Sequence, residues 1–499
     1  MSRSLKWSLV FLAWLPFLGG VLWFIYHTKV LIGVVVDENG PVAGVQVQVA
    51  GTHRIQTTGT SGRFIFWKSE PEFVVTAWKD GYFIGHLESE AESRRIDLRR
   101  LPTEDFENDE RKVVAGHGQQ GCNSCHKSIV DEMEYGRHWR TSGTFNLFYG
   151  GIAPKKSAQS WTLLDERPEG SEVCASCHAP IKMADWSGMS YAGIKLDQPK
   201  RLSGAIGCSI CHSVVGPARG EVGIAHGIYG LEFLRPKDRD VVFGPFKDAI
   251  REDTAYSPFQ KQSRLCASCH EGVVFGVRVY ETYSEWQASP TGKMGAQCQD
   301  CHMKPTGKMT NMAPGHGGVE RDPNALANHR FFDGNQLEML KRCLDLNLNP
   351  TRATDQVQVK IEIAANGVGH RVPTGLPDRN LTLVVEAFDA NGKPVAATAG
   401  TTLPPFMGPD LKGKAGKLFA KVLKDWEGKS PVPFWRAAPE FDDSRLTPGQ
   451  TESLEFTFPS SAASIRARLL YRKFWPEVIK QKGWPDDPWV VAEKTQTIK

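Results

Sequence analysis

The sequence predicts a multi-domain fold with an N-terminal transmembrane helix, a small β-sandwich, a mostly α-helical and irregular central domain, and a C-terminal β-sandwich. Three observations predict this order: one apolar run near the N-terminus, period-two alternation of hydrophobic residues in two separate segments, and five copies of a short cysteine motif between those segments. The expected domains are residues 1–29, 30–102, 103–345 and 346–499.

The composition is that of a globular protein with little net charge. Hydrophobic residues make up 40% of the 499 residues, and 60 basic residues against 56 acidic ones leave a net charge of +4. No run of Lys or Arg is long enough to suggest nucleic-acid binding, so nucleic acid is not expected as a partner.

The apolar run at residues 7–26 is long enough to cross a bilayer as a helix. A cleaved signal peptide is the alternative, but the run continues past Gly20 and no Ala-X-Ala site follows it. Arg3 and Lys6 precede the run, which favours a cytoplasmic N-terminus. We therefore expect a single-pass protein of the bacterial inner membrane, anchored by this helix, with the remaining domains in the periplasm.

The segment 30–102 has the pattern of short β-strands separated by turns. An Asn-Gly turn signal lies at residues 39–40, and strands are expected at residues 30–36, 45–49, 63–67 and 73–78. The segment resembles the carboxypeptidase regulatory-like domain at residues 33–37, 41–45, 58–64 and 79–82. The resemblance implies a transthyretin-like sandwich that acts as a spacer or docking module. We interpret His53 and His86, which lie in this segment, as exposed loop residues.

Ten of the eleven cysteines form five Cys-X-X-Cys-His motifs, a pattern typical of covalent haem c attachment. Zinc and disulfides are the alternatives, but structural zinc needs four ligands per site and does not explain a His directly after every second Cys. The sequence therefore predicts five covalently bound haem c groups. The thioether-forming residues are Cys122, Cys125, Cys174, Cys177, Cys208, Cys211, Cys266, Cys269, Cys298 and Cys301, and the proximal iron ligands are His126, His178, His212, His270 and His302.

The central domain has roughly 40 residues per motif, too few to build an ordinary hydrophobic core around each cofactor. We expect the haems themselves to fill the interior, wrapped by short helices and loops. The remaining cysteine, Cys343, has apolar neighbours at helical spacing and is interpreted as a packing residue.

After residue 346 the alternation returns, at residues 357–363, 381–388, 454–458 and 465–469, and predicts a second sandwich. Between them, the stretch from 403 to 443 is expected to be a long loop with one short helix near residues 417–426.

A sixth iron ligand decides whether a haem only carries electrons or also binds substrate. His138, His329 and His370 are the favoured distal ligands, and His370 lies in a tight loop between two strands of the last domain. Three further candidates are His226, His316 and His117. Ligation by one of the methionines near the motifs (Met183, Met294, Met303, Met309, Met312) stays open for at most one haem.

Several segments together resemble the bacterial multihaem c-type cytochromes related to the tetrahaem cytochromes of hydroxylamine oxidation. They are residues 135–148, 207–212, 283–290, 298–305, 329–331 and 369–375. The resemblance implies bis-His haems in stacked and perpendicular pairs, electron transfer, and His138, His329 and His370 as distal ligands. Residues 299–303 are also similar to pentahaem nitrite reductases, but every motif here ends in His and none in the Lys of their catalytic haem.

The function that these patterns favour is electron transfer between redox proteins, such as a quinol-linked enzyme and other cytochromes. A multihaem oxidoreductase acting on a small nitrogen or sulfur compound at a five-coordinate haem is the alternative, and a scaffold built around the sandwiches is the third. No catalytic residue is assigned, and the sequence does not predict the oligomeric state.

Overall fold

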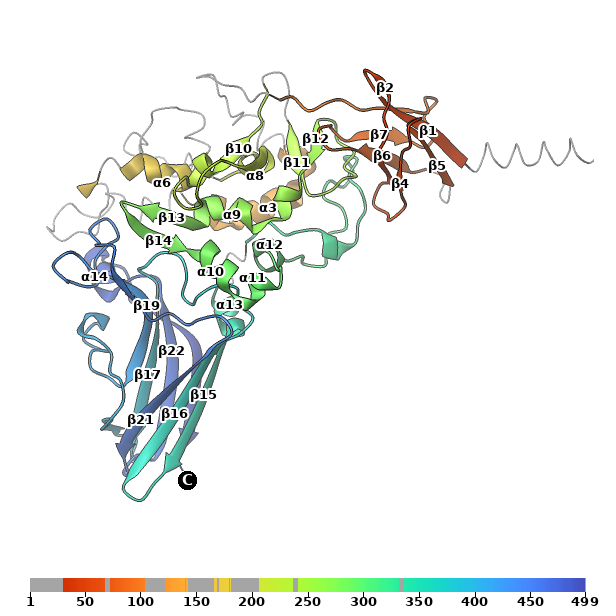
Figure 1. The fold of residues 1–499 in the computed structure, drawn as a ribbon. Coiled ribbons are helices and arrows are strands. Elements are labelled where there is room, and N and C mark those ends of the chain that lie inside the picture. The colour runs from red at the N-terminus through yellow and green to blue at the C-terminus, as the bar shows by residue number, and fades with distance from the viewer. Residues whose placement is uncertain are drawn as a thin grey trace, which may run out of the picture.

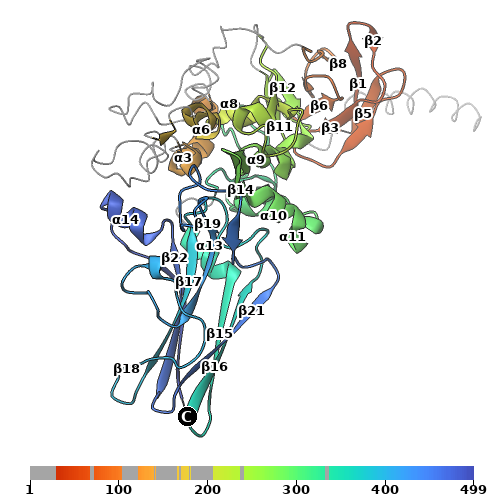
Figure 2. The same ribbon diagram turned by 60° about the vertical axis from the view of Figure 1, so that its left-hand side comes forward.

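The computed structural model describes residues 30–67, 72–103, 122–139, 141, 166–167, 170–178, 180, 206–236, 241–331 and 336–498. Within these residues two β-sheet bodies flank a central region of short helices. Figure 1 shows the first body in red at one end of the central region and the second in blue and teal on another side of it, and the turned view in Figure 2 agrees.

The first sandwich encloses its core between two sheets. One sheet has the strand order β2 (Gly40–Pro41), β1 (Val30–Asp37), β5 (Arg63–Trp67), with β8 (Arg95–Asp97) parallel to β1. The other has the order β4 (Ile55–Thr57), β3 (Gln46–Val49), β6 (Val74–Trp78), β7 (Gly85–Glu88). Alternate side chains such as Leu31, Val47 and Val75 are completely buried, as expected for half-buried strands.

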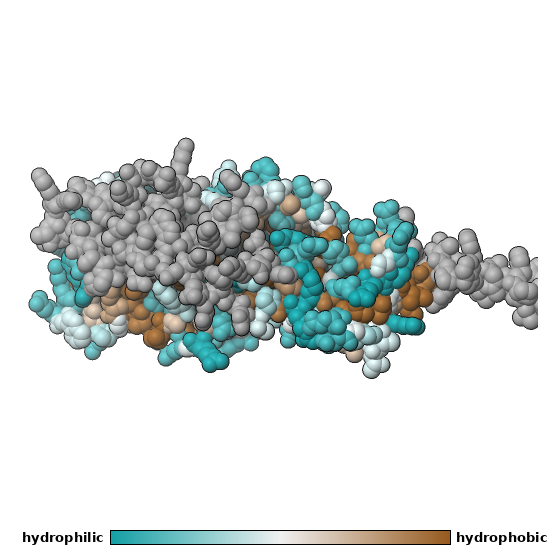
Figure 3. Space-filling model, turned by 90° about the horizontal axis from the view of Figure 1, so that it is seen from above, coloured by the Kyte–Doolittle hydropathy of each residue, from teal (hydrophilic) through white to brown (hydrophobic). Residues whose placement is uncertain are grey.

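The β4–β5 side of this sandwich carries apolar side chains on its surface. Ile55, Ile65 and Trp67 are 46%, 44% and 63% exposed. Hydrophobic residues are visible on this body from above in Figure 3. The gap between the two edge strands is closed by Gln56, whose Oε1 accepts from the Ile65 backbone N–H at 3.0 Å and whose Nε2 donates to the Ile65 carbonyl. A side chain here takes the place of the missing neighbouring strand.

The central region is built from short elements, and its longest described helices have nine residues. Its helices are α3 (Lys127–Tyr135), α6 (Gly170–His178), α8 (Cys208–His212), α9 (Ser263–His270), α10 (Thr282–Ala288), α11 (Pro290–Lys293), α12 (Cys298–His302) and α13 (Gln336–Cys343), with 3-10 turns η3 (Gly227–Gly230), η4 (Pro258–Lys261) and η5 (Pro323–Ala325). Two-stranded ladders pair β9 (Val214–Pro217) with β10 (Leu231–Phe233), β11 (Val242–Gly244) with β12 (Thr254–Tyr256), and β13 (Glu271–Val274) with β14 (Val277–Glu281).

The C-terminal body is a second sandwich with a continuous apolar interior. Its three-stranded sheet has the order β15 (Leu344–Arg352), β16 (Gln356–Ala365), β21 (Thr451–Pro459). Its larger sheet has the order β20 (Phe441–Asp443), β19 (Gly416–Leu423), β17 (Asn380–Phe388), β22 (Ser464–Arg472), β23 (Trp489–Thr497), with β18 (Pro394–Val395) beside β17. The remaining described elements are η6 (Pro405–Met407) and α14 (Pro476–Lys482).

The helix predicted near residues 417–426 is wrong, because residues 416–423 form strand β19. This strand lies between β17 and β20, and both of its faces are largely covered: Phe419 packs into the sandwich interior, while Ala420 and Val422 pack into a second cluster on the outer side. A strand buried on both faces loses its period-two pattern, which is why its apolar residues were misread as helical.

The predicted fold class and localisation need correction at the N-terminus. No helix among the described residues is both long and apolar enough to cross a membrane. Nine residues of helix span only about 14 Å, against a hydrocarbon core of about 30 Å. The described chain begins with strand β1, and the apolar run at residues 7–26 lies outside the described residues. The transmembrane helix and the single-pass inner-membrane localisation are therefore not retained.

The first sandwich is docked firmly on the central region. Phe83 joins a buried cluster with Leu234, Val241, Phe243 and Ala255, and the Ile84 N–H donates to the Thr254 carbonyl at 2.9 Å.

A buried ion pair supports the same contact. Asp248 and Arg321, with side chains 3% and 9% exposed, form two hydrogen bonds of 2.7 and 2.9 Å, and Asp248 also accepts from the Gly51 N–H of the first sandwich at 2.8 Å. The contact between the first sandwich and the central region therefore combines an apolar cluster with a buried ion pair.

Replacing Asp248 by Asn should destabilise the protein by about 3 kcal/mol, because the buried guanidinium of Arg321 loses its counter-ion. Asp253→Asn is the matched control: its partner Arg99 has a side chain 48% exposed, so the loss should stay below about 1 kcal/mol. Denaturant unfolding followed by far-UV circular dichroism measures both. Equal losses in the two variants would contradict the structural role given to Asp248.

Candidate haem-binding site

In the described helices, the cysteine motifs lie at the C-terminal ends. Four of the motifs end α6, α8, α9 and α12, and each helix terminates at the motif histidine. The first motif differs, since His126 lies directly before α3 as its N-cap. The three-residue spacing places both cysteines of a motif on one helical face, from which both thiols can reach one macrocycle.

The thiols of different motifs lie next to one another. The hydrogen bond with Cys269, together with burial, raises the pKa of Cys177 well above its usual value. Similar thiol contacts join Cys208 to Cys122 and Cys266 to Cys298. The second motif thus adjoins the fourth, the fourth adjoins the fifth, and the first adjoins the third, so groups attached to them would be close neighbours.

The described cysteines form neither disulfides nor a cluster of metal ligands. All eleven cysteines are described, and none of them forms a disulfide. Among the described residues no three His, Cys, Asp or Glu side chains come together as a metal site. The cysteines therefore remain available for thioether bonds.

Hydrogen bonds orient several of the motif histidines. His126 Nδ1 donates to the Met312 carbonyl at 2.9 Å, and His212 Nδ1 donates to the Phe243 carbonyl at 2.7 Å. His178 Nδ1 lies 2.7 Å from the Thr141 hydroxyl. When Nδ1 carries the proton, Nε2 keeps its lone pair, which is the arrangement that a metal-binding imidazole needs.

Two pairs of histidine rings lie at the separation that an iron between them requires. The ring centroids of His302 and His370 are 6.2 Å apart with planes at 24°, and those of His138 and His270 are 6.1 Å apart with planes at 83°. Since each metal–imidazole bond is about 2 Å long, two axial rings on one iron have centres roughly 6 Å apart. Each pair combines one motif histidine with one histidine predicted as a distal ligand.

These rings are held in the neutral form. Burial, together with the nearby His302, lowers the pKa of His138 to about 4. Burial likewise lowers the pKa of His302 to about 4. The buried Nδ1 of His138 has no hydrogen-bond partner. Uncharged imidazoles in pairs have lone pairs free for a metal, so the residues fit a haem iron ligated from both sides.

The other predicted distal ligands are less closely associated with a motif histidine. Burial, together with the nearby His212 and His126, lowers the pKa of His329 to about 4, and its backbone N–H donates to Glu132 at 2.8 Å. His226 is half-buried at the start of η3, next to Gly227, where a Cβ would lie 2.5 Å from the Ser176 backbone of the second motif. His316 is exposed, and His117 lies outside the described residues.

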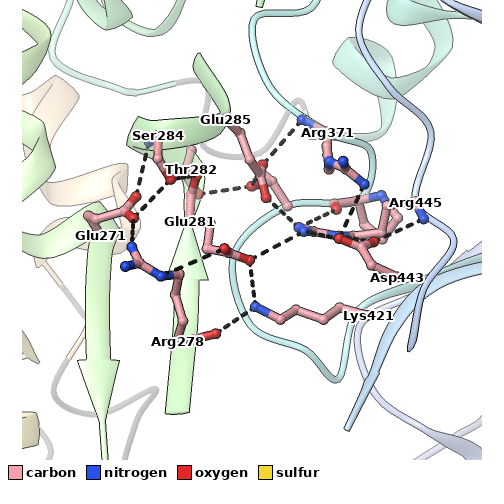
Figure 4. Close-up of polar contacts among 12 residues, drawn as sticks. Glu271, Arg278, Glu281, Thr282, Ser284, Glu285, Arg371, Lys421, Asp443 and Arg445 are labelled. Atoms are coloured by element: carbon pink, nitrogen blue, oxygen red, sulfur yellow. Dashed lines mark hydrogen bonds and ion pairs between the residues drawn. The ribbon is translucent and has the colours of Figure 1, made fainter. Parts of the chain in front are cut away.

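A cluster of charged residues, not predicted from the sequence, lies where the central region meets the C-terminal sandwich (Figure 4). Arg445 lies 2.6 Å from Glu285, 2.8 Å from Asp443 and 3.7 Å from Glu281. The Lys421 side chain, 2% exposed, donates to Glu281 at 2.6 Å, and burial lowers the pKa of Lys421 although Glu281 opposes this. Arg371, directly after His370, pairs with Asp443 at 3.2 Å. We call these six residues the interdomain charge cluster.

Comparison with known proteins points in the same direction as this geometry. Residues 121–213, which contain three of the five motifs, match the family described as cytochrome c554 and c-prime. No curated protein sequence matches the chain.

A solved penta-haem cytochrome shares the fold. A penta-haem cytochrome c552 from Thermochromatium tepidum aligns with 76% of this chain and 98% of its own length, at a TM-score of 0.53 and 22% identity. The Fcho1 Mu homology domain of Danio rerio (10% identity, 32% of this chain, 44% of its own) and a family 123 glycoside hydrolase of Clostridium perfringens (11%, 30%, 21%) have TM-scores of only 0.13 and 0.12. Those two carry no argument. The motifs, the paired histidines and the family match support a multihaem c-type cytochrome with covalently bound haem c.

Proposed function

We propose that this chain transfers electrons between redox partners through five covalently bound haem c groups. When bound, each haem iron supplies a one-electron redox centre. The observation that carries the proposal is the pairing of a motif histidine with a second histidine at an iron-spanning distance, found for His302 with His370 and for His270 with His138. An iron closed by two imidazoles has no position left for a substrate, and this favours electron transfer over catalysis.

The five motif histidines would be the proximal ligands, and the distal ligands follow from their neighbours. His370 would serve the motif of His302, His138 that of His270, and His329 that of His212, which is the histidine with the strongest influence on its pKa. His226, His316 and His117 remain the candidates for the motifs of His126 and His178.

The role of the first sandwich is also a proposal. Its resemblance to carboxypeptidase regulatory-like domains suggests a spacer or docking module, and its firm contact with β11 and β12 supports a fixed orientation on the central region. The redox partners would be a quinol-linked enzyme or other cytochromes, which exchange electrons with low-spin haems.

The haem count can be measured by intact mass. We expect the wild-type chain to carry five haem groups, and the double variant Cys298→Ser with Cys301→Ser to carry four, since both thioether bonds of one haem are lost. Cys343→Ser is the control and should keep all five, because Cys343 belongs to no motif. A wild-type protein with fewer than five, or a loss in the control, would refute the assignment of the cysteines.

Irons with two histidine ligands should not bind small external ligands. We expect the visible and EPR spectra of the dithionite-reduced and oxidised wild-type protein to show low-spin haem and no change with carbon monoxide or nitrite. His370→Ala should open one iron and create one carbon monoxide site per chain. His86→Ala, at an exposed position of the first sandwich, should create none. Binding of carbon monoxide or nitrite by the wild-type protein would contradict a purely electron-carrying role.

A further inference from the structure

Glu285 occupies a buried position between the central region and the C-terminal sandwich and contacts the loop that carries His370. Its side chain is only 6% exposed, on helix α10 of the central region. One carboxylate oxygen accepts from Arg445 Nη1 at 2.6 Å. The other accepts from the Arg371 backbone N–H at 3.2 Å and from the Thr374 hydroxyl at 2.8 Å. Three donors from the C-terminal sandwich thus converge on one carboxylate.

The ring of His370 is tied to the same peptide segment. His370 Nδ1 donates to the Arg371 carbonyl at 3.1 Å, while the N–H of Arg371 is held by Glu285. The orientation of the ring therefore depends on the backbone of Arg371, which Glu285 fixes from the opposite domain.

The other end of this arrangement leads to a second motif histidine. Glu271 directly follows His270, and its buried carboxylate accepts from the backbone N–H of Ser284 at 3.1 Å and from the Ser284 hydroxyl at 2.9 Å. Ser284 is the neighbour of Glu285 in α10 (Figure 4). Helix α10 is thus attached to the residue after His270 on one side and to the His370 loop on the other.

Stability alone does not explain a carboxylate at this place. Burying charged groups costs desolvation energy, and a well-packed apolar contact of similar volume often holds an interface equally well. What a carboxylate adds is direction, because it accepts several donors at fixed geometry, and charge-assisted hydrogen bonds are the strongest of their kind. Beside a proposed iron ligand, hydrogen bonds of fixed geometry can hold the ligand ring in one orientation.

We propose that Glu285 is a positioning residue that sets the plane of the His370 ring relative to that of His302. This inference rests on the proposed function, in which the two histidines share one iron. Their planes lie at 24°, close to parallel, whereas those of His138 and His270 lie at 83°. Low-spin irons with near-parallel imidazoles give a rhombic three-line EPR signal, and those with near-perpendicular imidazoles give a single signal of large g anisotropy. The second pair is therefore an internal reference in the same molecule.

The test uses the full-length holo-protein, oxidised EPR spectra and potentiometric titration of each signal. Glu285→Gln keeps the side-chain volume, but its amide nitrogen cannot accept from the loop. Thr374→Val removes one donor at constant size, and Thr374→Ser restores the hydroxyl. Glu338→Gln, at a position 54% exposed on α13, is the control.

We expect the rhombic signal assigned to the His302 iron to shift towards larger anisotropy in Glu285→Gln, and less strongly in Thr374→Val. Its midpoint potential should move with it. The signal from the perpendicular pair should stay unchanged, and Thr374→Ser and Glu338→Gln should match the wild type. If Glu285→Gln fails to incorporate five haems, Thr374→Val decides the matter.

An unchanged rhombic signal and potential in Glu285→Gln, or in Thr374→Val where that variant decides, would overturn the positioning role. His370→Ala separates this outcome from a failure of the proposed ligation. If the rhombic signal persists in His370→Ala, His370 does not ligate that iron and the ligand assignment itself is wrong. If it disappears in His370→Ala but is unchanged in Glu285→Gln, the ligation stands and only the role of Glu285 falls.

Discussion

An iron held by two imidazoles needs both rings on one axis and about 6 Å apart, and the ligation proposed for His302 with His370 would place this constraint on the contact between two parts of the chain. The motif fixes one ring within a turn of helix. The second ring must come from elsewhere in the chain and must be held at the correct distance from the first. In the proposed ligation, His370 would supply this ring from the C-terminal sandwich, so the central region and that sandwich would have to keep a fixed relative position. The interdomain charge cluster lies at the contact between these two parts of the chain.

The two sandwiches provide what the central region lacks. Short helices of nine residues or fewer and isolated two-stranded ladders are not stable by themselves in water. Each sandwich has a continuous apolar interior of its own and presents loops to the centre from a rigid base. The centre, in turn, needs only to bring its motifs together, since the macrocycles would supply its interior. The two sandwiches thus frame a region built from short elements.

Local patterns in the sequence predicted some parts of this structure well. The cysteine motifs and the alternating strands such as β16 and β21 depend on spacing over a few residues, which a single sequence displays directly. A family resemblance implied that His370 is a distal ligand, but nothing in the sequence paired it with His302, because 68 positions separate the two residues. Strand β19 was misread because burial on both faces removes the signal on which a strand prediction depends.

Other parts were beyond a reading of the sequence for a different physical reason. The hydrogen-bond partners of His126 and His212 are backbone carbonyls. Every residue has such a carbonyl, so the residue type at a position does not indicate this contact. The buried ions are similar: Glu285 and Arg445 are 160 positions apart, and charged residues are ordinarily solvent-exposed. Only the folded chain distinguishes these two from the many charged residues on the surface.

Phe243 takes part both in the contact with the first sandwich and in the orientation of a motif histidine, and this has a consequence for truncated forms of the protein. Its side chain packs against Phe83 of the first sandwich, while its carbonyl orients His212. Removing residues 30–102 would expose this aromatic side chain to water and release the strand whose backbone holds the imidazole. A truncated protein without its first sandwich is therefore not simply the haem-binding part in isolation. Loss of haem absorbance in such a protein would reflect the lost support of β11 and His212 rather than a missing cysteine motif.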